Sequence, residues 1–113
     1  MLYIGVDLGT SAVKLLLMDE NGNIQKIVSK EYPLYFPKPG WSEQHPEDWY
    51  IKSMEGMKEL TSECDKSQVA GISFGGQMHG LVALDKDDQV IRPAILWNDG
   101  RTGKQTDYLN QVI

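Results

Sequence analysis

The sequence contains a single cysteine, Cys64, so it cannot form an internal disulfide. Positive charge is also scarce, because 11 lysines and arginines stand against 16 aspartates and glutamates, for a net charge of −5. This balance argues against a nucleic-acid or anionic-membrane surface, so we expect neither kind of partner. Disulfides are rare in reducing compartments, and the lone cysteine therefore favours a cytoplasmic location.

Long hydrophobic runs are missing. No apolar stretch approaches the roughly 20 residues that a membrane-spanning helix needs. The N-terminus lacks the basic and long apolar regions of a signal peptide, so we expect none. With 113 residues, 41% of them hydrophobic and 24% charged, the chain is expected to form at most one ordinary globular domain.

Two common nucleotide-binding motifs are absent as well. The chain has no Gly-x-x-x-x-Gly-Lys-Ser/Thr loop, and no Gly-x-Gly-x-x-Gly opens a helix. A nucleotide site here would be neither a P-loop nor a Rossmann turn.

What the N-terminus does contain is an Asp-x-Gly-Thr-Ser turn within MLYIGVDLGTSAVKLLLM, which predicts two strands joined by a tight turn. Gly9 would let the backbone approach a phosphate closely, and Thr10 and Ser11 offer hydroxyl and N–H donors. Asp7 could hold a hydrated magnesium ion. These residues are also ordinary turn formers, so the motif alone does not decide between a phosphate site and a plain hairpin.

The remaining pattern predicts an α/β fold. A turn at Glu20–Asn23 and a third strand over 24–32 would complete a three-stranded antiparallel meander. Pro46 predicts a helix start. The apolar face of that helix, expected in the core, consists of Tyr50, Met54, Met57, Leu60 and Cys64. Further extended segments are expected at 69–74, 81–84, 90–91 and 94–97, and a second helix over 103–113, which has no stop signal and so predicts an incomplete domain.

A second group of candidate ligand-binding residues follows the short buried strand expected at 69–74. Gly75-Gly76-Gln77-Met78-His79-Gly80 leaves the backbone room to turn sharply against a ligand. Gln77 and His79 could bond sugar hydroxyls, and Met78 could give an apolar contact. Open α/β sheets place ligands at this end of a central strand. The alternative is a β-bulge at the glycines and a histidine without a ligand.

A third segment, Ile95–Thr102, brings the aromatic Trp97 beside amide, acid and guanidinium groups. Asp99 and Arg101 could pair at the lip of a cleft. For the loop 99–102 we expect a structural role, capping the following helix, more than a contact with substrate.

Four segments in this order, YIGVDLGTSAVKLLLMDENG, GWSEQHPEDWY, GISFGGQMHGLVALD and RPAILWNDGRT, resemble the start of the xylulose kinases, a branch of the FGGY carbohydrate kinase family. The resemblance implies a ribonuclease-H-like domain of the actin-like ATPase fold, with helices packed on a mixed sheet. Residues 1–113 would be the N-terminal part of the first kinase domain, on the sugar-binding side. The second, nucleotide-binding domain would lie outside them.

The resemblance also implies roles for individual residues. Asp7 matches a metal-associated acid with a supporting catalytic role. The residues that match the nucleotide-phosphate side are Gly9, Thr10, Ser11 and Lys14. The residues that match the sugar site are Gln77, Met78 and His79. His45 departs from the family, which often has aspartate there, and we expect a weaker helix cap.

The implied reaction is phosphorylation of D-xylulose to D-xylulose 5-phosphate, with ATP and Mg²⁺ as cofactors. The general base and adenosine site would lie beyond residue 113, so residues 1–113 alone are expected to be inactive. Two alternatives stay open: a kinase for another pentulose or sugar acid, and a non-catalytic actin-like module that binds sugar or nucleotide. A homodimer through an exposed sheet edge also stays open.

Overall fold

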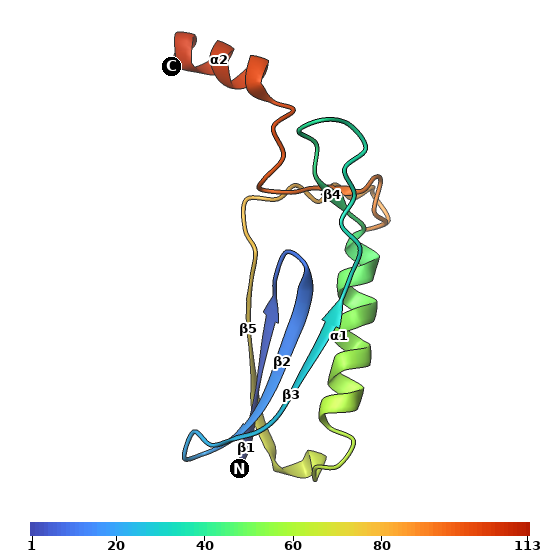
Figure 1. Ribbon diagram of the computed structural model, residues 1–113, viewed down its shortest axis with the longest axis vertical. Helices are drawn as coiled ribbons and strands as arrows, with labels where there is room; N and C mark the ends of the chain where they lie inside the picture. Colours follow the sequence, from blue (N-terminus) through green and yellow to red (C-terminus); the bar gives the residue numbers. More distant parts are fainter.

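The computed structural model describes all residues 1–113, and its main sheet has four strands in the order β3-β2-β1-β5 (Figure 1). β1 (Leu2–Leu8), β2 (Ala12–Asp19) and β3 (Ile24–Glu31) form the predicted antiparallel meander. β5 (Val69–Gly76) runs parallel to β1, so the sheet is mixed, as predicted.

The β2–β3 connection shows why the meander turns where it does. The Asp19 carboxylate accepts the backbone N–H groups of Asn21 and Asn23, both at 2.9 Å. Gly22 has a φ of 83°, in the left-handed region that favours glycine. Local hydrogen bonding and one glycine therefore fix this turn.

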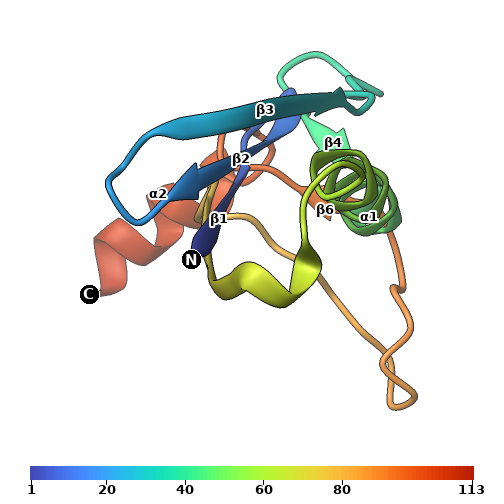
Figure 2. The same ribbon diagram turned by 90° about the horizontal axis from the view of Figure 1, so that it is seen from below.

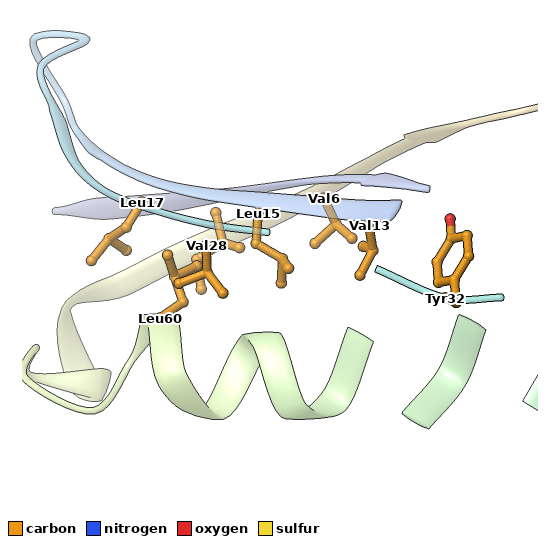
Figure 3. Close-up of a cluster of buried hydrophobic side chains, with 8 residues drawn as sticks. Val6, Val13, Leu15, Leu17, Val28, Tyr32 and Leu60 are labelled. Carbon is orange, nitrogen blue, oxygen red and sulfur yellow. The ribbon is translucent and has the colours of Figure 1, made fainter. Parts of the chain in front are cut away.

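The core lies between the meander and one helix, α1 (Pro46–Leu60), which covers one face of the sheet (Figures 2 and 3). An added Cβ at Gly56 would lie 2.5 Å from Leu15 Cδ1, so glycine is needed for the close approach of α1 to β2. The helix begins at Pro46, as predicted, and its N-cap residue His45 makes no side-chain cap bond. The buried cluster comprises Ile4, Val6, Val13, Leu15, Leu17, Val28, Tyr32 and Leu60.

The predicted apolar face of α1 was partly wrong. Leu60 is buried and Met57 packs against the core, but Tyr50 and Met54 are exposed. They line an apolar cavity of about 680 Å³ between α1 and β5 instead of entering the core. The reason is that α1 packs on the meander (Figure 2), so only its meander-facing side is covered.

The prediction for β5 also needs correction. A buried central strand ending before the glycines was expected, yet β5 continues through Gly75 and Gly76, which pair with Asp7 and Leu8. Its only neighbour in the sheet is β1, and Phe74 is 69% exposed. β5 is therefore an edge strand of the sheet formed by residues 1–113.

A second, two-stranded sheet lies at the end of the main one. β4 (Glu43–Gln44) pairs with β6 (Ala94–Ile95), and Leu81 makes an isolated bridge to Ile95. The strand predicted at 81–84 is wrong, because this stretch pairs only at its two end residues, Leu81 and Leu84. Of the extended segment predicted at 94–97, only Ala94 and Ile95 form a strand.

Two further elements complete the chain. A single 3₁₀ turn, η1 (Lys66–Gln68), leads into β5. α2 (Gly103–Val112) is the predicted second helix; it projects from the rest of the chain and buries none of its residues (Figure 1). The radius of gyration is accordingly 17.8 Å, against about 13 Å for a compact domain of about 100 residues. Neither helix has the length and apolar character that crossing a membrane requires.

Candidate functional site

The two segments that the sequence singled out meet at one end of the main sheet. β1 and β5 are parallel, so their carboxyl ends, Leu8 and Gly76, lie side by side. Open α/β sheets bind ligands at such strand ends. A cavity of about 390 Å³ opens here, lined by Asp7, Gly9, Thr10, Gly76, Gln77, Met78, His79 and Trp97.

The β1–β2 turn presents free backbone donors. The N–H of Gly9 donates to the Ala12 carbonyl at 3.0 Å, and an added Cβ on Gly9 would lie 3.0 Å from the same oxygen. By contrast, the backbone N–H groups of Thr10 and Ser11 have no acceptor within the chain. Successive free N–H groups in a tight turn form a concavity suited to an anion.

A tyrosine directly after β3 supports the turn. The Tyr32 hydroxyl donates to the Gly9 carbonyl, and the ring is buried. Burial first, and the charge of Asp7 second, raise the pKa of Tyr32 to about 12. Asp7 itself is exposed at the end of β1 and lines the cavity, so its carboxylate can reach a ligand.

The segment after β5 is tied to the turn. The Gln77 N–H donates to the Leu8 carbonyl at 2.8 Å. The Thr10 hydroxyl donates to Gln77 Oε1 at 3.5 Å, and Gln77 Nε2 donates to Gln44 Oε1 at 3.2 Å. The expected sugar-binding and phosphate-binding segments therefore share one hydrogen-bond network.

Met78 and His79 complete this side of the cavity. Met78 is 69% exposed, which is high for an apolar side chain in a cavity wall. His79 has a φ of 61°, in the left-handed region, where a non-glycine residue is strained by roughly 1–2 kcal/mol. Such strain is concentrated at functional sites.

Trp97 also lines the cavity, although its sequence position predicted no site role for it. Its indole Nε1 donates to the Thr10 hydroxyl at 3.1 Å, and the side chain is 56% exposed. An aromatic residue directly after a short strand and before a polar loop was the available signal. Trp97 extends the network to a third segment of the chain.

Ser11 and Lys14 lie differently from the other expected site residues. Neither lines the cavity, and both are exposed. Lys14 stands opposite Asp7 in the β1–β2 ladder, so the two side chains share one face of the sheet.

The predicted pairing of Asp99 with Arg101 is confirmed, and it lies outside the cavity. Arg101 Nε donates to Asp99 Oδ1 at 2.8 Å, and its Nη2 also donates to Glu43 at 2.7 Å. The hydrogen bonds from Arg101 are the main reason that the pKa of Asp99 lies well below its ordinary value. No side chain caps α2, so the expected capping role of this loop is wrong. The pair instead holds the loop against β4.

A protein-built metal cage is absent, because no three His, Cys, Asp or Glu side chains cluster in residues 1–113. Asp7 is the only acid in the cavity wall. One carboxylate suits Mg²⁺ that arrives with a nucleotide, since this ion keeps several waters and binds one or two carboxylates plus phosphates. The residues present therefore fit a nucleotide-bound magnesium ion.

Residues 2–113 match the N-terminal domain of the FGGY family of carbohydrate kinases. The chain belongs to that family. A xylulose kinase of Bacillus subtilis (strain 168) is 54% identical over 104 residues, which cover 90% of this chain and 21% of the relative. A gluconokinase of the same strain is 33% identical over 99 residues, covering 88% of this chain and 19% of that protein.

Solved FGGY kinases share the fold. The xylulose kinase from Rhodospirillum rubrum superposes with a TM-score of 0.95 at 29% identity, covering all of this chain and 24% of that one. FGGY kinases have the actin-like ATPase fold, so the expected fold class is confirmed. The chain spans about a fifth of the length of the curated FGGY relatives that it matches.

Proposed function

We propose that the protein carrying residues 1–113 is a cytoplasmic kinase that transfers the terminal phosphoryl group of ATP to D-xylulose. The observation that carries this proposal is the cavity in which Asp7, Gly9 and Thr10 of the β1–β2 segment face Gln77, Met78 and His79. One side offers a carboxylate and free N–H donors, and the other offers groups suited to a sugar. The similarity to xylulose kinases supports the same substrate.

The turn would hold the phosphate side of the reaction. Phosphoryl transfer depends mainly on positioning and charge stabilisation. The free N–H groups of Thr10 and Ser11 would donate to phosphate oxygens, and the Asp7 carboxylate would orient the water shell of the magnesium ion. Magnesium supplies the neutralisation of phosphate charge when it is bound. Lys14 would add positive charge on the same face as Asp7.

The segment after β5 would hold the sugar. The Gln77 side chain is already engaged with Thr10 and Gln44, so its part is to fix the wall. The imidazole of His79 would bond a sugar hydroxyl, while Met78 and Trp97 would cover the carbon skeleton. We assign no general base to residues 1–113 and place it, with the adenosine site, in a second domain of the full-length protein.

A sugar acid is the second candidate substrate, because a gluconokinase is among the relatives. The charges of the cavity wall argue against a sugar acid as the substrate. No lysine or arginine lines the wall contributed by residues 1–113, and the one charged residue there is Asp7. A substrate carboxylate would find no cationic partner among these residues, so a neutral ketose fits them better.

A coupled phosphorylation assay of the full-length protein tests the proposal against D-xylulose, ribulose, fuculose, gluconate and glycerol. We expect selective turnover of D-xylulose, a kcat loss of about 10²-fold or more in Asp7→Asn, and a raised KM for the sugar in His79→Ala. Asp19→Asn, in the exposed β2–β3 turn, is the matched control and should keep wild-type kinetics.

Each other outcome has a distinct meaning. Selective turnover of gluconate would replace the ketose by a sugar acid and keep the reaction. No turnover of any sugar, with binding retained, would indicate a non-catalytic module. Residues 1–113 produced alone should show no kinase activity, and turnover above that of their Asp7→Ala variant would contradict the placement of the general base.

A further inference from the structure

One buried amide side chain joins the two halves of the cavity without lining it. Gln44, in β4, is 0% exposed. Its Nε2 donates to the Thr10 carbonyl at 2.5 Å, and its Oε1 accepts from Trp49 Nε1 at 3.0 Å and from Gln77 Nε2 at 3.2 Å. The side chain therefore contacts the β1–β2 turn, α1 and the segment after β5.

The Gln44 amide can be buried at little cost because both its nitrogen and its oxygen are hydrogen-bonded. An unpaired amide in an apolar environment costs roughly 1–3 kcal/mol by protein mutational data. Gln44 has one donor bond and two acceptor bonds, which leaves no freedom to flip, because Thr10 offers only an acceptor and Trp49 only a donor. The side chain is thus locked in one orientation.

The partners of Gln44 are far apart in sequence. Thr10 lies 34 residues before it and Gln77 lies 33 residues after it. The direct link between these partners is the weak 3.5 Å bond from the Thr10 hydroxyl. Gln44 supplies a second connection through shorter bonds, and Trp49 anchors that connection to the helix.

We propose that Gln44 is a positioning residue that sets the spacing between the phosphate-binding turn and the sugar-binding segment. Its role in turnover rests on the proposed function, because that function names the two ligands. A transferred phosphoryl group and an attacking hydroxyl must lie within about 3–3.5 Å, and small misplacements cost large factors in rate. The bonds of Gln44 to Thr10 and Gln77 form a bridge between the two segments. Loss of this bridge should therefore lower kcat more than it weakens the binding of either substrate.

Two variants remove the bridge in different ways. Gln44→Met keeps the approximate length and volume of the side chain but removes all three hydrogen bonds. Gln44→Glu keeps an oxygen for Trp49 and Gln77 and replaces the donor to the Thr10 carbonyl by an acceptor. The second variant keeps the test available if Gln44→Met does not fold.

The kinetic test uses the full-length protein with D-xylulose and ATP. We expect kcat to fall about tenfold or more in both variants, with KM for each substrate changed by less than about threefold. Val28→Ala is the control, because Val28 belongs to the core cluster and does not line the cavity. At a temperature where all variants are folded, the control should keep wild-type kcat although it lowers stability.

A second readout needs no substrate. The amides of Gly9 and Gln77 are hydrogen-bonded to Ala12 and Leu8, and they report on the two joined segments. In Gln44→Met, both amides should exchange hydrogen about fivefold to tenfold faster relative to the core amides of β2, as expected for the loss of about one hydrogen bond. In Val28→Ala, which weakens the core itself, this ratio should not rise.

The outcomes separate the two proposals. If the wild type is active and Gln44→Met and Gln44→Glu match the control in kcat, the positioning role is overturned and the kinase function stands. If the wild type phosphorylates no sugar, the proposed function fails, and hydrogen exchange alone decides the bridge. Unchanged exchange at Gly9 and Gln77 would then overturn the bridge, and faster exchange at both would support it.

Discussion

The guanidinium of Arg101 holds the carboxylate of Asp99 through two hydrogen bonds, Nε to Oδ1 at 2.8 Å and Nη2 to Oδ2 at 2.6 Å. Asp99 Oδ2 also accepts the Ser42 N–H at 2.6 Å, and the guanidinium carbon lies 3.6 Å from the ring centroid of Trp41. The pair therefore ties the loop after β6 to the segment that leads into β4, which carries Gln44.

Asp99→Asn should lower the free energy of unfolding by about 1–3 kcal/mol at neutral pH, because hydrogen bonds to a charged group are lost. The bonds from Arg101 depress the pKa of Asp99 below 3.8 in the folded state. Its contribution is therefore complete above pH about 4, declines below it, and disappears beneath the depressed folded pKa. Urea unfolding of both proteins from pH 2 to 7 measures this, and a difference that grew on acidification would contradict it.

Tyr32 should titrate at about 12, and Asp7→Asn should lower that pKa without returning it to 10.0, since burial is the larger cause. A raised tyrosine pKa stabilises the fold fully below pH 10 and less as pH rises towards 12. Ultraviolet difference titration of wild type, Tyr32→Phe and Asp7→Asn reads the phenol directly. Asp19→Asn should leave the value unchanged, and a Tyr32 pKa near 10 in the wild type would refute the assignment.

Gly76→Ala should destabilise the β1–β5 pairing, whereas Gly75→Ala should change the free energy of unfolding by less than about 0.5 kcal/mol. An added Cβ at Gly76 would lie 3.0 Å from Leu8 Cβ and 3.1 Å from the Leu8 carbonyl oxygen, while one at Gly75 meets nothing within 4 Å. Chemical denaturation of the two neighbouring variants provides the comparison. Equal free energies of unfolding for the two variants would show that Leu8 can shift to make room for the added Cβ at little cost.

His79→Gly should raise the free energy of unfolding by about 1 kcal/mol, because glycine adopts the φ of 61° without strain. The same variant should weaken sugar binding, as the imidazole is lost. His79→Ala separates the effects, since it loses the imidazole and keeps the strain. Thermal unfolding measures the stability, and calorimetric sugar titration measures the affinity for the sugar. If His79→Gly were less stable than the wild type, the imidazole would contribute more to stability than the backbone strain costs.

The elements that the sequence predicted well depend on local signals. The β1–β2 turn, the Gly22 turn and the start of α1 at Pro46 each follow from a few neighbouring residues, and all three are present. The two segments that meet at the cavity were singled out for the same reason, because glycines and polar side chains follow short apolar runs directly.

Elements that depend on distant partners were predicted less well. The exposure of Tyr50 and Met54 is set by which side of α1 meets the meander, and the periodicity of a helix carries no such information. Gln44 bonds Thr10 and Gln77, which are 34 and 33 positions away, and Trp97 bonds Thr10, which is 87 positions away. Gln44 and Trp97 are brought to the site by the pairing of β4 with β6. Strands of two residues are too short to be predicted from a sequence pattern.

The parallel pairing of β1 with β5 also determines when the cavity can exist during folding. β1, β2 and β3 are neighbours in sequence and can pair early, but Thr10 and Gln77 are 67 residues apart, and long-range parallel pairing is slow. A chain in which only the meander has formed would present the β1–β2 turn without the opposite wall of the cavity. We therefore expect binding competence to appear with the last long-range pairing, and a ligand that touches both walls to slow the unfolding of β5 specifically.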